Sequence, residues 1–177
     1  TVEIHEEGPR EGFQIEPGPI STVDKVKLID ALSKTGLKHI QACSFVNPRL
    51  VPGWADAEKV VESFDAHEDV EYTGLYFNGN GLDRALAFKD KLTISGSISL
   101  TASEGFTKKN LNRTHAENMA AMERHVMSHL ELGIPVNRIG VMAAFGCNYQ
   151  GDISPATVIK TLEDGMQIAA KTGAEIT

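Results

Sequence analysis

The chain has 177 residues, of which 41% are hydrophobic and 23% are charged, and its formal net charge is −7. This length allows one domain with a substantial core. The acidic balance argues against a general role on nucleic acids or membrane surfaces, although a local basic patch could still bind an anion. No apolar run approaches the roughly 20 residues that a membrane-spanning helix needs.

The cysteine content and the first residues indicate the compartment. Cys43 and Cys147 are too few for a disulfide framework. The segment that starts at Thr1 has neither the basic nor the apolar region of a signal peptide, and its lack of Met suggests trimming at this end. We therefore expect a cytoplasmic protein. No Gly-x-Gly-x-x-Gly motif or phosphate-binding loop supports a nucleotide cofactor.

Apolar runs alternate with amphipathic stretches along the chain. In chain order, the pattern predicts a strand at 2–4, a loop at 7–14, a helix at 22–35, a strand at 38–43, a loop at 47–53, a helix at 55–64, a strand at 70–76, a helix at 81–88, a strand at 92–97, a loop at 103–112, a helix at 114–132, a strand at 138–144, a loop at 145–153, a helix at 154–172 and a strand at 174–177. Gly36 and Gly173 are placed to end helices, and Ser154-Pro155 is placed to begin one.

This alternation of six strands with five helices favours a parallel sheet with helices outside it. A doubly wound sheet suits six strands, whereas a TIM barrel needs eight strands and typically about 250 residues. The pattern alone does not decide between them. The chain ends on the predicted strand at 174–177 without a closing helix. We therefore expect residues 1–177 to be a single domain that is cut in mid-fold.

The loop after the first predicted strand carries the most informative chemistry. It places Arg10 beside Glu11, in a segment stiffened by Pro9. A carboxylate at a strand end can hold a divalent cation, and a neighbouring arginine can stabilise an enolate or a thioester oxygen. A surface ion pair within a turn is the alternative for an isolated Arg-Glu dipeptide.

Four ordered motifs, each after a predicted strand, resemble the hydroxymethylglutaryl-CoA lyases. This family belongs to a metal-dependent TIM-barrel superfamily of lyases and acyl-CoA condensing enzymes. The four segments are Gly8-Pro9-Arg10-Glu11-Gly12-Phe13-Gln14-Ile15-Glu16, Ser44-Phe45-Val46-Asn47-Pro48 with Val51-Pro52, Ala102-Ser103-Glu104-Gly105-Phe106-Thr107-Lys108-Lys109-Asn110, and Phe145-Gly146-Cys147-Asn148-Tyr149-Gln150-Gly151 with Ile153-Ser154-Pro155.

The resemblance implies a TIM (β/α)8 barrel with about six of its eight strands in this chain. It implies that Arg10 is catalytic and polarises the thioester carbonyl, and that Glu11 binds a divalent cation, Mg²⁺ or Mn²⁺. Substrate contacts are expected from five further residues, namely Gln14, Ser103, Lys108, Lys109 and Asn110. Four residues are expected around the site without touching substrate, and structural roles are favoured for the two cysteines among them: Gln41, Cys43, Tyr76 and Cys147.

The implied activity is metal-dependent cleavage of a 3-hydroxy-3-substituted glutaryl-CoA-type thioester to acetyl-CoA and a keto acid. Hydroxymethylglutaryl-CoA or a branched relative would be the substrate, and we expect a homo-oligomer. Two alternatives are a Claisen condensation of an acyl-CoA with a keto acid, and a non-catalytic barrel with a lost metal site.

Two positions depart from the family pattern. Glu11 stands where the family typically has Asp, and Gln41 stands where its lyases commonly have Glu. Both changes favour a substrate related to, but different from, hydroxymethylglutaryl-CoA. The family's later metal-binding histidines, its Asn ligand and its catalytic Cys on a Gly-rich loop have no counterpart within residues 1–177, so we expect these residues alone to be inactive.

Three histidines remain outside this scheme. His5 is expected in the core or beside the site. His125 and His129 have the i, i+4 spacing of some zinc ligands, but their helix should lie outside the barrel, so we expect surface positions.

Overall fold

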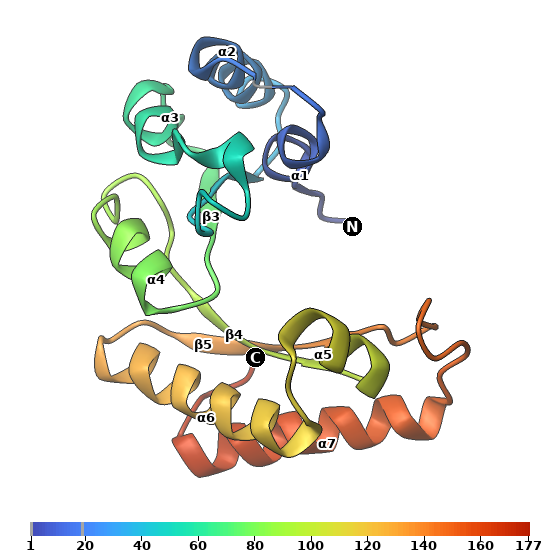
Figure 1. The fold of residues 1–177 in the computed structure, drawn as a ribbon. Coiled ribbons are helices and arrows are strands. Elements are labelled where there is room, and N and C mark those ends of the chain that lie inside the picture. Colours follow the sequence, from blue (N-terminus) through green and yellow to red (C-terminus); the bar gives the residue numbers. More distant parts are fainter. Residues whose placement is uncertain (1, 19) are drawn as a thin grey trace. The chain divides into compact units, whose positions relative to one another are not determined.

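The computed structural model describes residues 2–18 and 20–177, and the chain divides into two compact units, Thr1–Ile94 and Ser95–Thr177. Every strand pairing among the described residues is parallel. Strands and helices alternate in the order expected for β/α units (Figure 1). Within the described residues, no helix combines the length and the apolar character needed to span a membrane.

The first unit contains a three-stranded sheet in the order β1-β2-β3. Neighbouring strands are paired in register from their first residues, with His5 opposite His39 and His39 opposite Glu71. Its elements are β1 (His5–Glu6), α1 (Gly8–Ile15), α2 (Thr22–Leu32), β2 (His39–Ser44), the 3₁₀ helix η1 (Pro52–Trp54), α3 (Ala57–Ser63), β3 (Glu71–Leu75) and α4 (Gly79–Leu86).

Trp54 anchors the core of this unit. Its side chain is fully buried, and its indole N–H donates to the main-chain oxygen of Arg10 at 2.9 Å. The buried Lys25 ammonium lies 4.8 Å from the indole ring centroid and donates to Asp56 at 2.5 Å. The position of α1 is therefore set by a buried ring and by a hydrogen bond to its backbone.

The second unit pairs β4 (Gly96–Thr101) with β5 (Val136–Met142). The helices α6 (His115–Glu131) and α7 (Pro155–Thr172) pack against this pair and against each other, and α5 (Glu104–Leu111) follows β4 (Figure 1). The core here consists of apolar residues from β4, β5, α6 and α7: Ile98, Leu100, Val126, Val136, Ile168 and Ala169.

The predicted ends of the long helices are confirmed. Thr114 caps α6 in a capping box with Glu117, and Ser154 caps α7 through its hydroxyl. Gly173 ends α7 at φ 80°, a left-handed conformation that glycine adopts without a steric penalty.

Two segments that we expected to be loops form helices instead. Residues 7–14 fall largely in α1, where Pro9 occupies a first-turn position that requires no N–H donor. Residues 103–112 contain α5, which the Ser103 hydroxyl caps by accepting from Phe106 N at 3.1 Å. In both cases the helix-start signal outweighs the turn propensity of the glycines and polar residues.

Three strand predictions also need correction. The first strand lies at His5–Glu6 instead of 2–4. The fourth begins at Gly96 because Leu92 and Ile94 pack into the core of the first unit. Residues 174–177 form no strand, although Thr177 N donates to Asn137 O at 3.0 Å. Five strands are therefore present among the described residues, where six were expected.

The prediction of a surface position is wrong for His129, whose residue is 1% exposed, and His125 is partly buried. Its ring packs over Gly96, where an added Cβ would lie 2.9 Å from the imidazole. His129 therefore faces the sheet and belongs to the packing of α6, and the absence of a side chain at Gly96 makes room for its ring.

Candidate functional site

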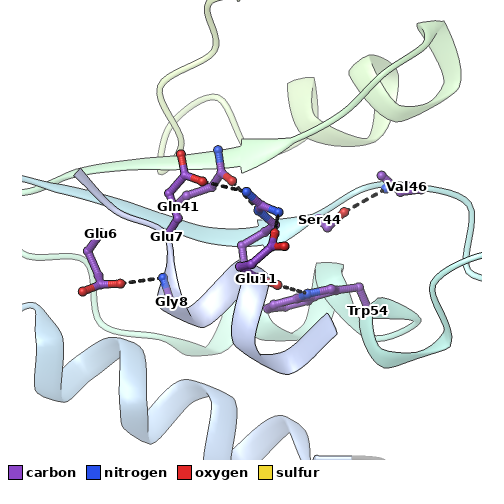
Figure 2. A network of polar contacts seen from close by, with 9 residues as sticks. Glu6, Glu7, Gly8, Glu11, Gln41, Ser44, Val46 and Trp54 are labelled. Carbon is purple, nitrogen blue, oxygen red and sulfur yellow. Dashed lines mark hydrogen bonds and ion pairs between the residues drawn. The ribbon is translucent and has the colours of Figure 1, made fainter. Parts of the chain in front are cut away.

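Arg10 is the centre of a polar network in the first unit. It lies in α1, and only 13% of its side chain is exposed. Its Nε donates to Gln41 Oε1 in β2 at 2.5 Å, its Nη2 contacts Glu7 Oε2 at 2.7 Å, and its Nη1 is paired with Glu11. The structure thus joins Arg10 with both positions that depart from the family pattern, Gln41 and Glu11, which are labelled in Figure 2.

Local geometry explains why these side chains meet. Glu7 and Arg10 have i, i+3 spacing at the start of α1, so they lie on the same face of the helix. The helix follows β1, and β1 pairs with β2, which carries Gln41. The strand β2 therefore supplies the amide of Gln41, and the helix α1, which follows the neighbouring strand β1, supplies the guanidinium of Arg10.

The network supplies oxygen atoms that could act as ligands to a cation. Glu7 and Glu11 expose about half of their side chains, at 54% and 53%. Carboxylate and amide oxygens are the donors that hard divalent cations prefer. A guanidinium carries five N–H donors, so the three contacts of Arg10 do not use its whole capacity. The arrangement can hold an anionic oxygen beside a cation.

Glu7 is the member of this network that sequence reasoning missed as a site residue. It precedes the motif as the N-cap residue of α1. The signal was the i, i+3 spacing from Arg10, which becomes informative only once residues 8–15 are recognised as a helix.

The motif after β2 lies next to the same core. Ser44 Oγ accepts from Val46 N at 3.4 Å (Figure 2). Arg84 in α4 donates to Phe45 O at 3.0 Å and pairs with Glu58 at 2.5 Å. The hydrogen bond from Arg84 lowers the pKa of Glu58, so this ion pair persists in mildly acidic solution. Arg84 therefore holds the turn after β2 through a hydrogen bond to its main chain.

Three other predicted residues of the first unit lie in different environments. Gln14 lines a pocket of about 620 Å³ together with residues of α2 and η1. Cys43 is fully buried, and burial raises the pKa of its thiol. Tyr76 is partly buried against the core, and burial raises its pKa as well. Among these three, the structure gives Cys43 the environment of a structural residue.

In the second unit, Ser103 links two of the sequence motifs. Its hydroxyl is buried and donates to Gln150 Oε1 at 3.1 Å, across to the loop that follows β5. Gly105 allows the start of α5 to approach Tyr149, since an added Cβ would lie 3.1 Å from the tyrosine Cβ. A hydrogen bond with Ser103 lowers the pKa of Cys147. The motif after β4 and the motif after β5 therefore contact each other.

The predicted basic residues, Lys108 and Lys109, are exposed. Lys108 and Lys109 occupy the last turn of α5, and Asn110 follows them. Cations at a helix C-terminus interact favourably with the helix dipole, which accounts for the lysines without a ligand. Both ammonium groups remain accessible to an anion.

Comparisons with known proteins extend this picture beyond the motifs. The chain is 40% identical over 157 residues to the mitochondrial hydroxymethylglutaryl-CoA lyase of Gallus gallus, covering 89% of this chain and 51% of that protein. The structure of this chain matches that of a hydroxymethylglutaryl-CoA lyase from Pseudomonas aeruginosa with a TM-score of 0.83 and 29% identity, over 95% of this chain and 55% of the other. No family model matches the chain.

This chain is related to the hydroxymethylglutaryl-CoA lyases. It spans about half the length of the curated relatives it matches. A lyase structure from Acinetobacter baumannii, in complex with coenzyme A and 3-methylmalate, matches with a TM-score of 0.78 and 32% identity, over 95% of this chain and 53% of that one. The fold is accordingly that of part of a TIM barrel, as the motifs predicted.

Proposed function

We propose that this chain contributes the N-terminal part of a barrel that cleaves a 3-hydroxy-3-substituted glutaryl-CoA-type thioester to acetyl-CoA and a keto acid. The observation that carries the proposal is the Arg10 guanidinium, fixed by Gln41 and Glu7 beside the carboxylate of Glu11. The relation to lyases over nearly the whole chain supports the reaction class.

The reaction is a retro-Claisen cleavage. The substrate's 3-hydroxyl loses its proton, the C2–C3 bond breaks, and its electron pair passes into the thioester to form an enolate. The former hydroxyl carbon becomes a ketone, and the enolate takes up a proton at C2 to give acetyl-CoA. In this scheme Arg10 donates to the thioester oxygen, where negative charge develops, an interaction typically worth about 2.7–4 kcal/mol per donor.

The network also contains carboxylates, the type of ligand that divalent cations prefer. Glu11, paired with Nη1 of Arg10, would be the first ligand, and the Glu7 carboxylate contacts Nη2 of the same guanidinium. Bound Mg²⁺ or Mn²⁺ would make a coordinated hydroxyl easier to deprotonate. Since one or two carboxylates hold such a cation poorly, we propose that the lyase activity requires ligands in addition to residues 1–177.

The substrate is proposed to be an acyl-CoA. Lys108 and Lys109 are exposed and provide positive charge for the phosphates of coenzyme A in an otherwise acidic protein. Gln14, Ser103 and Asn110 remain proposed substrate contacts. The bond from Ser103 to Gln150 implies that this hydroxyl would act mainly by positioning the loop after β5.

The test is acetyl-CoA release, measured by mass spectrometry with a panel of branched 3-hydroxyacyl-CoA thioesters. Protein containing this chain is assayed with Mg²⁺ or Mn²⁺ and again with chelator, and residues 1–177 are assayed alone. Chelator-sensitive release from the longer protein supports the proposal. A lack of release despite bound metal would favour condensation, and a lack of both would favour a non-catalytic barrel.

We also propose a cytoplasmic location. Both cysteines are free thiols in the structure, as is usual in a reducing compartment. Names of the relatives include both cytoplasmic and mitochondrial lyases. Imaging of the tagged full-length protein, or fractionation of its source cells, would decide between the compartments.

A further inference from the structure

The starts of the three strands in the first unit bring together side chains that the lyase proposal does not use. His5 begins β1, His39 begins β2 and Glu71 begins β3. The strand register pairs His5 with His39 and His39 with Glu71, so the three residues form one row across the sheet. Parallel neighbours in register project their side chains to the same face.

Glu3 extends this row into a compact group with nitrogen and oxygen donors. The rings of His5 and His39 are stacked, with centroids 4.2 Å apart and an interplanar angle of 16°. Glu3 Oε1 lies 2.5 Å from His39 Nε2. One ligand atom from each of Glu3, His5 and His39 can be chosen so that all three lie within 4.8 Å of one another.

Glu71 occupies the other side of His39. Its Oε2 lies 3.4 Å from His39 Nδ1. Histidines that bind a metal through one ring nitrogen commonly donate the other N–H to a carboxylate, which fixes the tautomer and increases the basicity of the ligand nitrogen. Glu71 is placed to do this, leaving His39 Nε2 directed toward Glu3.

We propose that Glu3, His5 and His39 form a second metal site, with Zn²⁺ as its preferred cation, and that Glu71 orients His39 within it. Two imidazoles and one carboxylate are a donor set that suits Zn²⁺, with water in the fourth position. Imidazole nitrogen favours zinc and its transition-metal neighbours over Mg²⁺. The site therefore differs in chemistry from the all-oxygen network around Arg10.

Zinc binding would require side-chain rotations, because the rings of His5 and His39 are nearly parallel and their in-plane nitrogen lone pairs do not point at one position. Ligand atoms around tetrahedral zinc are about 3.3 Å apart, given metal–ligand distances of about 2.0–2.2 Å. The Glu3 side chain is 64% exposed and the His39 side chain is 22% exposed, so the carboxylate is free to rotate and an ion can reach the imidazole. Because β1 has only two residues, a bound ion would join the segment before it to β2.

The proposed zinc ligands and the Arg10 network are different residues, although Gln41 of the network lies two residues after His39 in β2. His5 and His39 are first residues of parallel strands, whereas Arg10 lies in the helix that follows β1. Loss of the lyase site therefore need not affect zinc binding, and the two can be tested separately.

Isothermal titration of the metal-free full chain with ZnCl₂, together with Co²⁺ absorption spectroscopy, tests this proposal. We expect His5→Ala, at an exposed position, to remove one zinc equivalent and the tetrahedral Co²⁺ bands. Glu71→Gln should weaken this binding by about 10–100-fold. Excess Mg²⁺ should not displace the ion.

Two controls separate this site from other zinc binding. His115→Ala removes an exposed histidine that also contacts a carboxylate, Asp164, at 3.2 Å, and Glu11→Gln alters the proposed lyase site. Both should keep the zinc equivalent. His39→Ala should also remove the zinc equivalent; if this variant fails to fold, Glu3→Gln tests the same site, because Glu3 is exposed. Zinc binding that is absent in the unmodified chain, or unchanged in His5→Ala, would overturn the proposal.

Discussion

The Nε of Arg10 in α1 donates to Oε1 of Gln41 in β2 at 2.5 Å. This contact joins the residue proposed to stabilise the enolate to one of the two positions that depart from the lyase pattern. An amide accepts this hydrogen bond as a carboxylate would, but without a negative charge. The orientation of Arg10 is thereby preserved while the charge of its surroundings changes.

Arg10→Ala should lower kcat for acetyl-CoA release by about 10²–10³, the range seen when a donor to a developing oxyanion is removed. Arg10→Lys keeps the charge but loses the planar fork that meets Gln41 and Glu7 together, so it should recover only part of the rate. Steady-state kinetics with the longer protein measure both. A loss of only a few-fold in Arg10→Ala would contradict the assigned role.

Gln41→Leu should leave the Arg10 Nε–H without its acceptor and reduce kcat/KM at least about tenfold, because a buried unpaired donor typically costs about 1–3 kcal/mol. Gln41→Glu restores an acceptor and should retain activity while changing the preference among branched thioesters. Equal kcat/KM values for Gln41→Leu and the unmodified protein would show that this contact does not position Arg10.

Glu11→Ala should weaken Mg²⁺ or Mn²⁺ activation, because it removes the carboxylate proposed as a ligand. Activity measured against metal concentration should give a metal constant more than about tenfold higher, since single ligands contribute strongly to small sites. Glu7→Ala is the matched variant, as its carboxylate is similarly exposed and also contacts Arg10. Unchanged metal affinity in Glu11→Ala would remove Glu11 from the ligand set.

Trp54→Phe should lower the free energy of unfolding by about 0.5–1.5 kcal/mol through loss of the hydrogen bond to Arg10 O, in addition to a packing term. Trp54→Ala should cost more, about 3–5 kcal/mol, since it also empties a fully buried site. Urea unfolding gives both values. Similar losses in the two variants would mean that the indole N–H carries the anchoring.

Stability should fall as the pH decreases from about 6.5 toward 4. Burial, assisted by the neighbouring His129, lowers the pKa of His125 to about 4. Between these values the unfolded chain binds more protons at this residue than the folded chain does, so the free energy of unfolding decreases as the pH falls. His125→Gln should flatten this part of the stability curve, measured by urea unfolding from pH 7 to 4.

The elements with clear capping signals could be predicted from the sequence. Ser154-Pro155 and Gly173 mark the two ends of α7, and Thr114 marks the start of α6. The start of α1 was misread because glycines on both sides of Pro9 favour a turn in isolation. The first-turn position of Pro9 favours the helix, and the bond from the Trp54 indole to the Arg10 main chain then holds this segment in place.

The candidate site was predictable only in part for a related reason. The motif identified Arg10 and Glu11, but the role of Glu7 depends on the helical face it shares with Arg10. The row formed by His5, His39 and Glu71 depends on strand register, which becomes known only when the sheet is formed. Residues within the motifs, and Gln41 with them, could be identified from the sequence, whereas Glu7 and the row of His5, His39 and Glu71 could not.

The bond from the Trp54 indole to the main-chain oxygen of Arg10 has a consequence for how such a site can change over time. The Trp54 indole bonds to the backbone of α1, so this bond does not depend on which side chains α1 carries. Position 11, whose side chain is about half exposed, can therefore exchange one functional group for another while the helix keeps its place. Divergence of substrate preference, such as a step from Asp to Glu, becomes accessible through single substitutions without a loss of folding along the way.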